Sequence, residues 1–155
     1  IHTPSGYLFD YNYQGNKIAL IRAEDAYKVW SQQTHALSGG NALFEADPDL
    51  DGIPNGLEFF TGSNPAKFTK SHPLKASRIS SATSVSYPIS TLGQATLFRL
   101  QSSTNLINWD DSFPGGQSPT LREEEHFYGP GIGKFSQNII IPSDETRFFR
   151  FIHHP

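Results

Sequence analysis

The stretch SVSYPISTLGQATLFRLQS, residues 84–102, decides the class of fold that the sequence predicts. Apolar and polar residues alternate in its first and last parts, and a period of two is typical of strands that bury one face. The stretch therefore predicts two short β-strands. The residues expected to share a face are Val85, Tyr87 and Ile89 in the first strand and Phe98 and Leu100 in the second, with Leu97 and Arg99 on the opposite face.

Further strand patterns follow at NIII, residues 138–141, and at RFFRFI, residues 147–152. The glycine- and proline-rich segments PGG and GPGIG separate them, and such segments are turn signals. Several short strands with frequent turns favour an antiparallel sandwich over a parallel fold. We therefore predict an antiparallel β-sandwich over residues 67–155. Pro88 indicates an edge strand or a bulge, because proline has no N–H to donate.

The upstream part of the chain divides into two further predicted units. YLFDYNYQGNKIALIR, residues 7–22, is typical of a β-hairpin, so residues 1–22 are interpreted as a hairpin arm or, as the family resemblance given below implies, as the end of an upstream β-repeat domain. A lone hairpin is marginal in water, so this arm is expected to pack in cis or on another copy of the chain. Residues 23–66 are predicted to hold one helix, from Ala23 to about Leu37, and a calcium-binding loop, after which a short helical piece is expected around Leu57 to Thr61, ended by Gly62. The predicted fold is mainly β with a small helical part.

Residues 47–58, DPDLDGIPNGLE, match every specified position of the calcium-loop pattern D-x-[DN]-x-[DN]-G-x5-E. Carboxylates on alternate residues of a tight loop converge on one point, Gly52 permits the bend, and a glutamate on the following helical turn closes the shell. A hard divalent cation needs such oxygen ligands. The predicted Ca²⁺ ligands are Asp47, Asp49, Asp51, Ile53 through its backbone carbonyl, Asn55 through a bound water, and Glu58.

The alternative interpretation of this segment is a solvated acidic loop, since Asp-Pro and Asp-Gly are common in turns. The glutamate at the last position of the pattern favours calcium. Pro54 stands where paired EF-hands use an N–H to bridge to a sister loop, and proline cannot donate that bond. The sequence therefore favours a single structural clamp over a sensor pair.

Composition excludes several classes of function. The chain has 155 residues with 12 Lys and Arg against 15 Asp and Glu, and no basic stripe, so neither nucleic acid nor an anionic membrane is an expected partner. The absence of cysteine excludes disulfides and thiolate sites. The six histidines form no zinc pattern, and no GxSxG elbow is present, so we expect a non-catalytic protein. No apolar run approaches the ~20 residues of a membrane helix.

Four segments together resemble a known module: YKVW at 27–30, DPDLDGIPNGLEFFTGSNP at 47–65, SSTNLINW at 102–109 and RFFRFI at 147–152. They are similar to the carboxy-terminal module of large exported proteins of verrucomicrobial and planctomycete type, with a loop similar to those of dockerins and thrombospondin type 3 repeats. The resemblance implies a bacterial extracellular or cell-surface location. One departure is Leu50, where the module usually has glycine.

Three functions are left open by the sequence. The first is a calcium-stabilised structural or adhesion module of a secreted or surface protein. The second is a self-assembling subunit of an extracellular filament or array, formed by strand addition through residues 1–22. The third is a carbohydrate-binding module with Trp109 and Tyr128 as exposed platforms, although Trp109 is expected to be a core residue. The expected partners are other copies of the chain, other surface proteins, or glycans.

Overall fold

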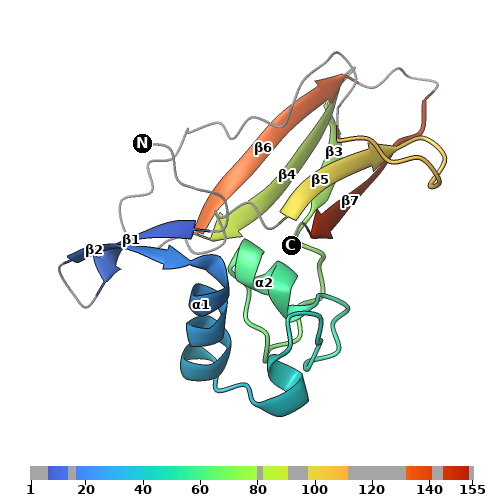
Figure 1. Ribbon diagram of the computed structural model, residues 1–155. Helices are drawn as coiled ribbons and strands as arrows, with labels where there is room; N and C mark the ends of the chain where they lie inside the picture. Colours follow the sequence, from blue (N-terminus) through green and yellow to red (C-terminus); the bar gives the residue numbers. More distant parts are fainter. Residues whose placement is uncertain are drawn as a thin grey trace.

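The structure is a computed structural model that describes residues 7–13, 17–79, 82–90, 98–111, 132–140 and 145–153. These ranges form seven strands, two α-helices, one π-helix and one 3₁₀-helix, and Figure 1 shows the helices gathered at one end of the strands. The elements are β1 Tyr7–Tyr13, β2 Lys17–Arg22, α1 Ala23–Lys28, η1 Val29–Thr34, η2 Gly39–Ala42, α2 Asn55–Thr61, β3 Lys75–Ile79, β4 Ala82–Ser90, β5 Phe98–Ser103, β6 Ile132–Ile140 and β7 Phe148–His153.

The predicted hairpin is confirmed by the pairing of β1 with β2. The two strands run antiparallel from the pair Tyr7 and Arg22 to the pair Tyr13 and Lys17, with an irregular register after Asp10. Residues 14–16, where the sequence predicts the turn, lie outside the described residues. The hairpin leads directly into α1, beside which it lies in Figure 1.

The helical part differs from the single helix predicted for residues 23–37. An α-helix covers only Ala23–Lys28, and the chain then continues as the π-helix Val29–Thr34. A second α-helix, Asn55–Thr61, follows the acidic loop and has all seven residues buried. It ends at Gly62, whose φ of 78° is the left-handed conformation that glycine adopts without strain. The short helical piece predicted around Leu57 to Thr61 is therefore confirmed as α2, a second α-helix beside the one helix predicted for the fold, and burial on both sides stabilises it.

The strands after residue 74 are antiparallel, as predicted, and form two separate sheets among the described residues. One sheet has the order β3, β4, β6, and the other pairs β5 with β7. Strand β3 was not predicted from the sequence. Pro88 lies in the central strand β4, but beyond Ser86, the last residue paired with β3. That half of β4 has a paired neighbour only in β6, which explains why proline is tolerated there.

The sandwich predicted over residues 67–155 is met only in part. The described strands and short helices make a small mixed arrangement, and the two sheets meet through a single apolar cluster instead of forming two full layers. In this cluster Tyr87 of β4 contacts Phe151 of β7, with ring centroids 4.9 Å apart. The physical reason lies in α2, whose side chains fill part of the space that a second layer of strands fills in a sandwich.

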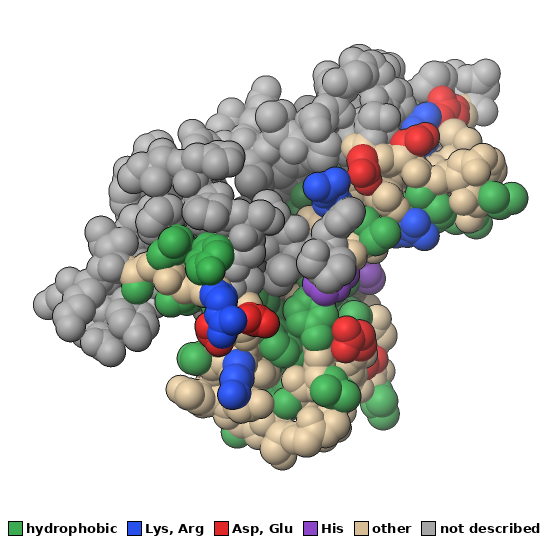
Figure 2. All heavy atoms as spheres, viewed as in Figure 1, with side chains coloured by type: hydrophobic (Ala, Val, Ile, Leu, Met, Phe, Trp, Pro, Cys, Tyr) green, Lys and Arg blue, Asp and Glu red, His purple; other side chains and the backbone are tan. Residues whose placement is uncertain are grey.

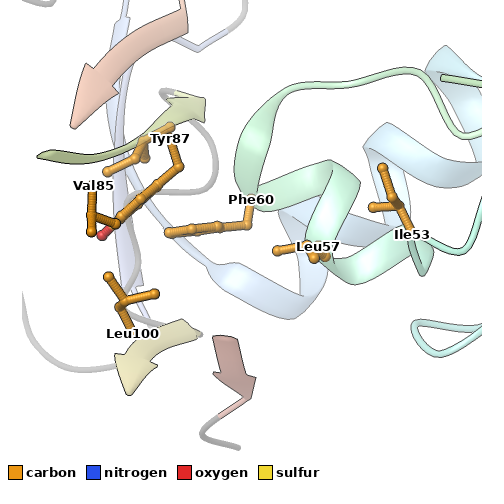
Figure 3. Packing of buried hydrophobic residues seen from close by; sticks show 7 residues of the cluster. Ile53, Leu57, Phe60, Val85, Tyr87 and Leu100 are labelled. Carbon is orange, nitrogen blue, oxygen red and sulfur yellow. The ribbon is translucent and has the colours of Figure 1, made fainter. Parts of the chain in front are cut away.

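Two apolar clusters form the core, and α2 contributes to both. Figure 3 shows Leu57 and Phe60 of α2 pointing toward Val85, Tyr87 and Leu100 of the sheets. On the other side of the helix, Phe59 packs against a second cluster. This second cluster contains Ala26, Trp30 and Phe59, with Ile21 and Tyr27 packed against it. Trp30 is 7% exposed and is therefore a core residue.

The surface of the described residues carries charges of both signs. On the face shown in Figure 2, the Lys and Arg side chains lie among acidic and hydrophobic ones, with no continuous basic area in the coloured part. Within the described ranges, each helix is too short or too polar to traverse a lipid bilayer.

Candidate metal centre

The loop between η2 and α2 brings the three predicted aspartates together. One carboxylate oxygen of each of Asp47, Asp49 and Asp51 lies within 4.8 Å of those of the other two. Among the described residues, this is the only group of three or more acidic or histidine side chains with such mutual distances. All three side chains are half-buried. The spacing read from the sequence therefore corresponds to a real convergence of carboxylates.

Backbone N–H groups of the loop hold these carboxylates in place. The Asp51 N–H donates to Oδ1 of Asp47 at 3.2 Å and to Oδ1 of Asp49 at 3.3 Å, and the Gly52 N–H donates to Oδ2 of Asp47 at 2.8 Å. The loop turns through Leu50 and Gly52, with φ of 61° and 86°. These turns aim successive N–H groups inward, so that the carboxylates are oriented by the loop itself.

Asp51 also connects the loop to the chain beyond α2. Its Oδ1 accepts from the Ile53 N–H at 2.8 Å, and its Oδ2 accepts from the Thr69 N–H at 3.0 Å. Thr69 was not predicted as part of the site, and no sequence motif marks a backbone N–H contributed from eighteen residues away. The site is therefore tied to both ends of α2.

Glu58, at the last position of the calcium pattern, is fully buried within α2. Its side chain has 0% exposure, and neither carboxylate oxygen has a hydrogen-bond partner of normal geometry. Asp49 Oδ2 and Asn55 Oδ1 are also buried without a partner. Of the five buried side-chain atoms without a partner among the described residues, four are oxygens of predicted calcium ligands. Buried polar groups are almost always satisfied, so this cluster of free oxygens requires an explanation.

The electrostatics of the site are those of carboxylates crowded away from water. Burial, followed by the negative charge of Asp49, raises the pKa of Glu58 to about 8, and the Ser63 hydroxyl opposes the rise only in part. Burial likewise raises the pKa of Asp49, with a contribution from the charge of Asp51. Both shifts mean that the protein disfavours these negative charges unless a positive charge lies near them.

The remaining predicted ligands are placed less directly. Glu58 is not part of the group of mutually close carboxylates, although the charge of Asp49 acts on it. The Ile53 side chain belongs to the core cluster, which anchors its backbone beside the loop. Asn55 is fully buried, and its Nδ2 donates to the carbonyls of Asn41 and Leu43 at 2.8 and 2.9 Å. Its Oδ1 is buried without a hydrogen-bond partner.

Of the two aromatic residues considered as a platform for a glycan, only Trp109 lies within the described residues. Tyr128 lies outside the described residues. Trp109 is half-buried, not a core residue, and the guanidinium carbon of Arg150 lies 4.1 Å from its ring centroid. The indole N–H donates to the Leu106 carbonyl at 3.3 Å. One face of the ring is therefore already covered by an arginine.

Comparisons with protein-family models, with characterised proteins and with solved structures found no match for this chain.

Proposed function

We propose that the loop of residues 47–58 binds one Ca²⁺ ion, which clamps α2 between the two apolar clusters. The observation that carries the proposal is the fully buried Glu58 carboxylate, which has no hydrogen-bond partner of normal geometry and is acted on by the negative charge of Asp49. The converging side-chain ligands all present oxygen, which suits a hard cation and excludes soft metals that prefer sulfur or imidazole.

A bound cation accounts for groups that are otherwise unfavourable. A buried carboxylate without a partner costs free energy, and several of them repel one another. Either protonation or a cation removes this cost. The backbone N–H groups of Asp51 and Gly52 orient the aspartates in a way that protonation of a single glutamate does not require. A cation among the three aspartates would satisfy the free oxygen of Asp49 and offset the negative charge that Asp49 places on Glu58.

The position of the site supports a structural role. Phe59 and Phe60 directly follow Glu58 in α2 and belong to the two separate apolar clusters. Asp51 is bonded to the Thr69 N–H, so a cation on the loop fixes the chain on both sides of α2. Pro54 lacks the N–H through which paired sensor loops communicate, which favours a clamp over a switch.

We infer that this clamp belongs to a non-catalytic structural or adhesion module at a bacterial cell surface or outside the cell. Extracellular modules bind calcium with dissociation constants of roughly 10⁻⁴ to 10⁻³ M, an affinity that is sufficient where calcium is millimolar. Other copies of the chain, other surface proteins or glycans are the proposed partners. The strands from β3 to β7 are proposed to belong to a sandwich-like unit on which the clamp is seated.

The experiment is a calcium titration by calorimetry, with thermal unfolding of the same samples in EDTA and in millimolar calcium. We expect saturable binding of one ion and stabilisation by about 2.7 kcal/mol at a hundred times the dissociation constant. Glu58→Gln keeps the shape of the side chain and should weaken binding more than tenfold. Glu45→Gln removes an exposed carboxylate next to the loop and should leave binding unchanged.

Equal calcium affinity in Glu58→Gln and in the unchanged chain would overturn the proposed site. Sedimentation of the same samples separates the clamp from assembly, because a calcium-stabilised monomer supports the clamp and calcium-independent polymers support the filament.

A further inference from the structure

The first two residues of α2, Asn55 and Gly56, are also a site of possible chemical modification. Asn55 and Gly56 form the only Asn-Gly pair in the sequence. This pair is the one most prone to succinimide formation, because glycine has no side chain to hinder the attack of its backbone nitrogen on the asparagine side chain. An exposed and mobile Asn-Gly pair therefore loses its amide spontaneously.

The folded chain holds the two reacting groups apart. The Asn55 side-chain amide donates to the carbonyls of Asn41 and Leu43, and the Gly56 N–H donates to the Phe44 carbonyl at 2.8 Å. Asn55 has 0% exposure. Both the leaving amide and the attacking nitrogen are thus engaged by one short segment, residues 41–44.

Side-chain contacts, and not strand pairing, dock that segment. The Tyr27 hydroxyl donates to the carbonyls of Ala42 and Leu43 at 3.2 and 3.0 Å, and burial raises the pKa of this phenol to about 12, so it stays a donor. The Phe44 ring packs on the backbone of Gly56. No named strand or α-helix includes residues 41–44, so local opening of this segment requires no loss of sheet pairing.

We propose that Asn55 is a latent deamidation site, protected only while residues 41–44 stay docked on α2, and that its deamidation releases the segment irreversibly. The reaction needs no cation and no cofactor. The Gly56 nitrogen, after losing its proton, attacks Cγ of Asn55, a C–N bond forms, the bond from Cγ to Nδ2 breaks, and ammonia leaves with the added proton. Water then opens the succinimide to aspartate or isoaspartate.

The products cannot restore the docked state. A carboxylate at residue 55 has no N–H to donate to Asn41 and Leu43, and two buried carbonyls lose their partner. It also places a new negative charge within three residues of the buried Glu58. Isoaspartate adds a methylene to the backbone and disrupts the first turn of α2. Residues 41–44 open reversibly before the modification, and after it they no longer return to the docked state.

The test follows deamidation by peptide mapping together with hydrogen exchange of the Gly56 amide. The unchanged chain is incubated in a series of urea concentrations below its unfolding midpoint, which raises opening without any substitution. We expect the deamidation rate at Asn55 to rise in proportion to the exchange rate at Gly56. Asn41, which precedes alanine, serves as the internal reference and should stay unmodified.

Tyr27→Phe supplies a second arm, because it removes the hydroxyl's hydrogen bonds to the carbonyls of residues 42 and 43 and its interaction with the Asn55 side chain, and keeps the ring. We expect deamidation and Gly56 exchange to rise several-fold together in this variant without urea. If Asn55 deamidates at the same rate in folded and fully denatured chains, or stays intact where Gly56 exchange has risen tenfold, the proposal is overturned.

Discussion

The ring of Phe44 occupies the place where a β-carbon of residue 56 would stand. A Cβ built on Gly56 lies 2.1 Å from Cε1 and 2.3 Å from Cζ of Phe44. The same ring contacts Tyr27, Phe98 and His153, with centroid distances of 5.0, 5.9 and 4.6 Å. Phe44 is thus enclosed on several sides and has little room to move. The approach of loop and helix is possible because residue 56 is glycine.

We therefore predict that Gly56→Ala destabilises the protein, although alanine is the better helix former by about 1 kcal/mol. Overpacking of this kind costs typically about 1–3 kcal/mol, so the net loss in urea unfolding is expected to reach about 2 kcal/mol. Gly40→Ala is the matched control, since a β-carbon there meets no atom within 4 Å. If Gly56→Ala were more stable than the unchanged chain, the Phe44 ring would have to move aside at little cost in free energy.

A second prediction concerns Leu50, which combines a φ of 61° with 80% exposure. A branched residue in the left-handed region is strained by roughly 1–2 kcal/mol, and an exposed leucine gains little in return. Leu50→Asn should therefore raise the free energy of unfolding by about 0.5–1 kcal/mol, because asparagine tolerates this conformation.

Leu43→Asn provides the comparison, because Leu43 is 60% exposed with an ordinary φ of −68°. Urea unfolding of both variants measures the difference. An equal change in both variants would mean that exposure, not backbone strain, decides the effect at Leu50.

The features that the sequence predicts well are those that depend on local order. The alternation in residues 7–22 predicted the hairpin, and the spacing of Asp47, Asp49 and Asp51 predicted their convergence. Neither requires knowledge of distant contacts, because a strand has period two and a tight loop fixes its own carboxylates.

The missed features depend on contacts between distant segments. The π-helix after Lys28 follows no composition signal, and Trp30 within it is buried against Phe59 of α2. The Thr69 N–H reaches Asp51 only through the folded chain. The short α2 is a weak helix by itself and is stabilised by packing in two clusters, so the sequence could not show that it replaces part of a sandwich.

A third prediction tests the polar network on the β5–β7 sheet. The Arg150 guanidinium lies over the Trp109 ring and donates through Nε and Nη2 to Oε1 of Gln101, at 3.0 and 2.8 Å. Arg150→Ala should cost roughly 0.5–1 kcal/mol from the lost cation–π contact. It should also shift the fluorescence of Trp109, measured in a Trp30→Phe background.

The control for this network is Arg99→Ala. Arg99 forms an exposed ion pair with Asp111 at 3.5 Å and is not stacked on a ring. Arg99→Ala should leave the fluorescence of Trp109 unchanged. It should change the free energy of unfolding very little, because exposed ion pairs contribute little. A larger shift of the Trp109 fluorescence in Arg99→Ala than in Arg150→Ala would contradict the stacking of Arg150 on Trp109.

The last prediction is the pH dependence of the calcium-free protein. The pKa of Glu58 is raised from 4.5 to about 8 in the folded state, mainly by burial. As pH rises from about 4.5 to 8, the unfolded chain loses this proton first, so the folded state binds more protons and the free energy of unfolding falls. The fall should be of the order of a few kcal/mol, and it should level off above pH 8.

Calcium reverses this trend, because the cation competes with the proton on Glu58 and binds more tightly as pH rises. Calorimetry near pH 7 in buffers of different ionisation enthalpy should detect about one proton released per ion bound. Glu58→Gln has no proton to lose, so the pH slope of its calcium-free stability between 5 and 8 should be much smaller. Equal slopes in the variant and the unchanged chain would assign the pH dependence to other groups and remove Glu58 from the clamp.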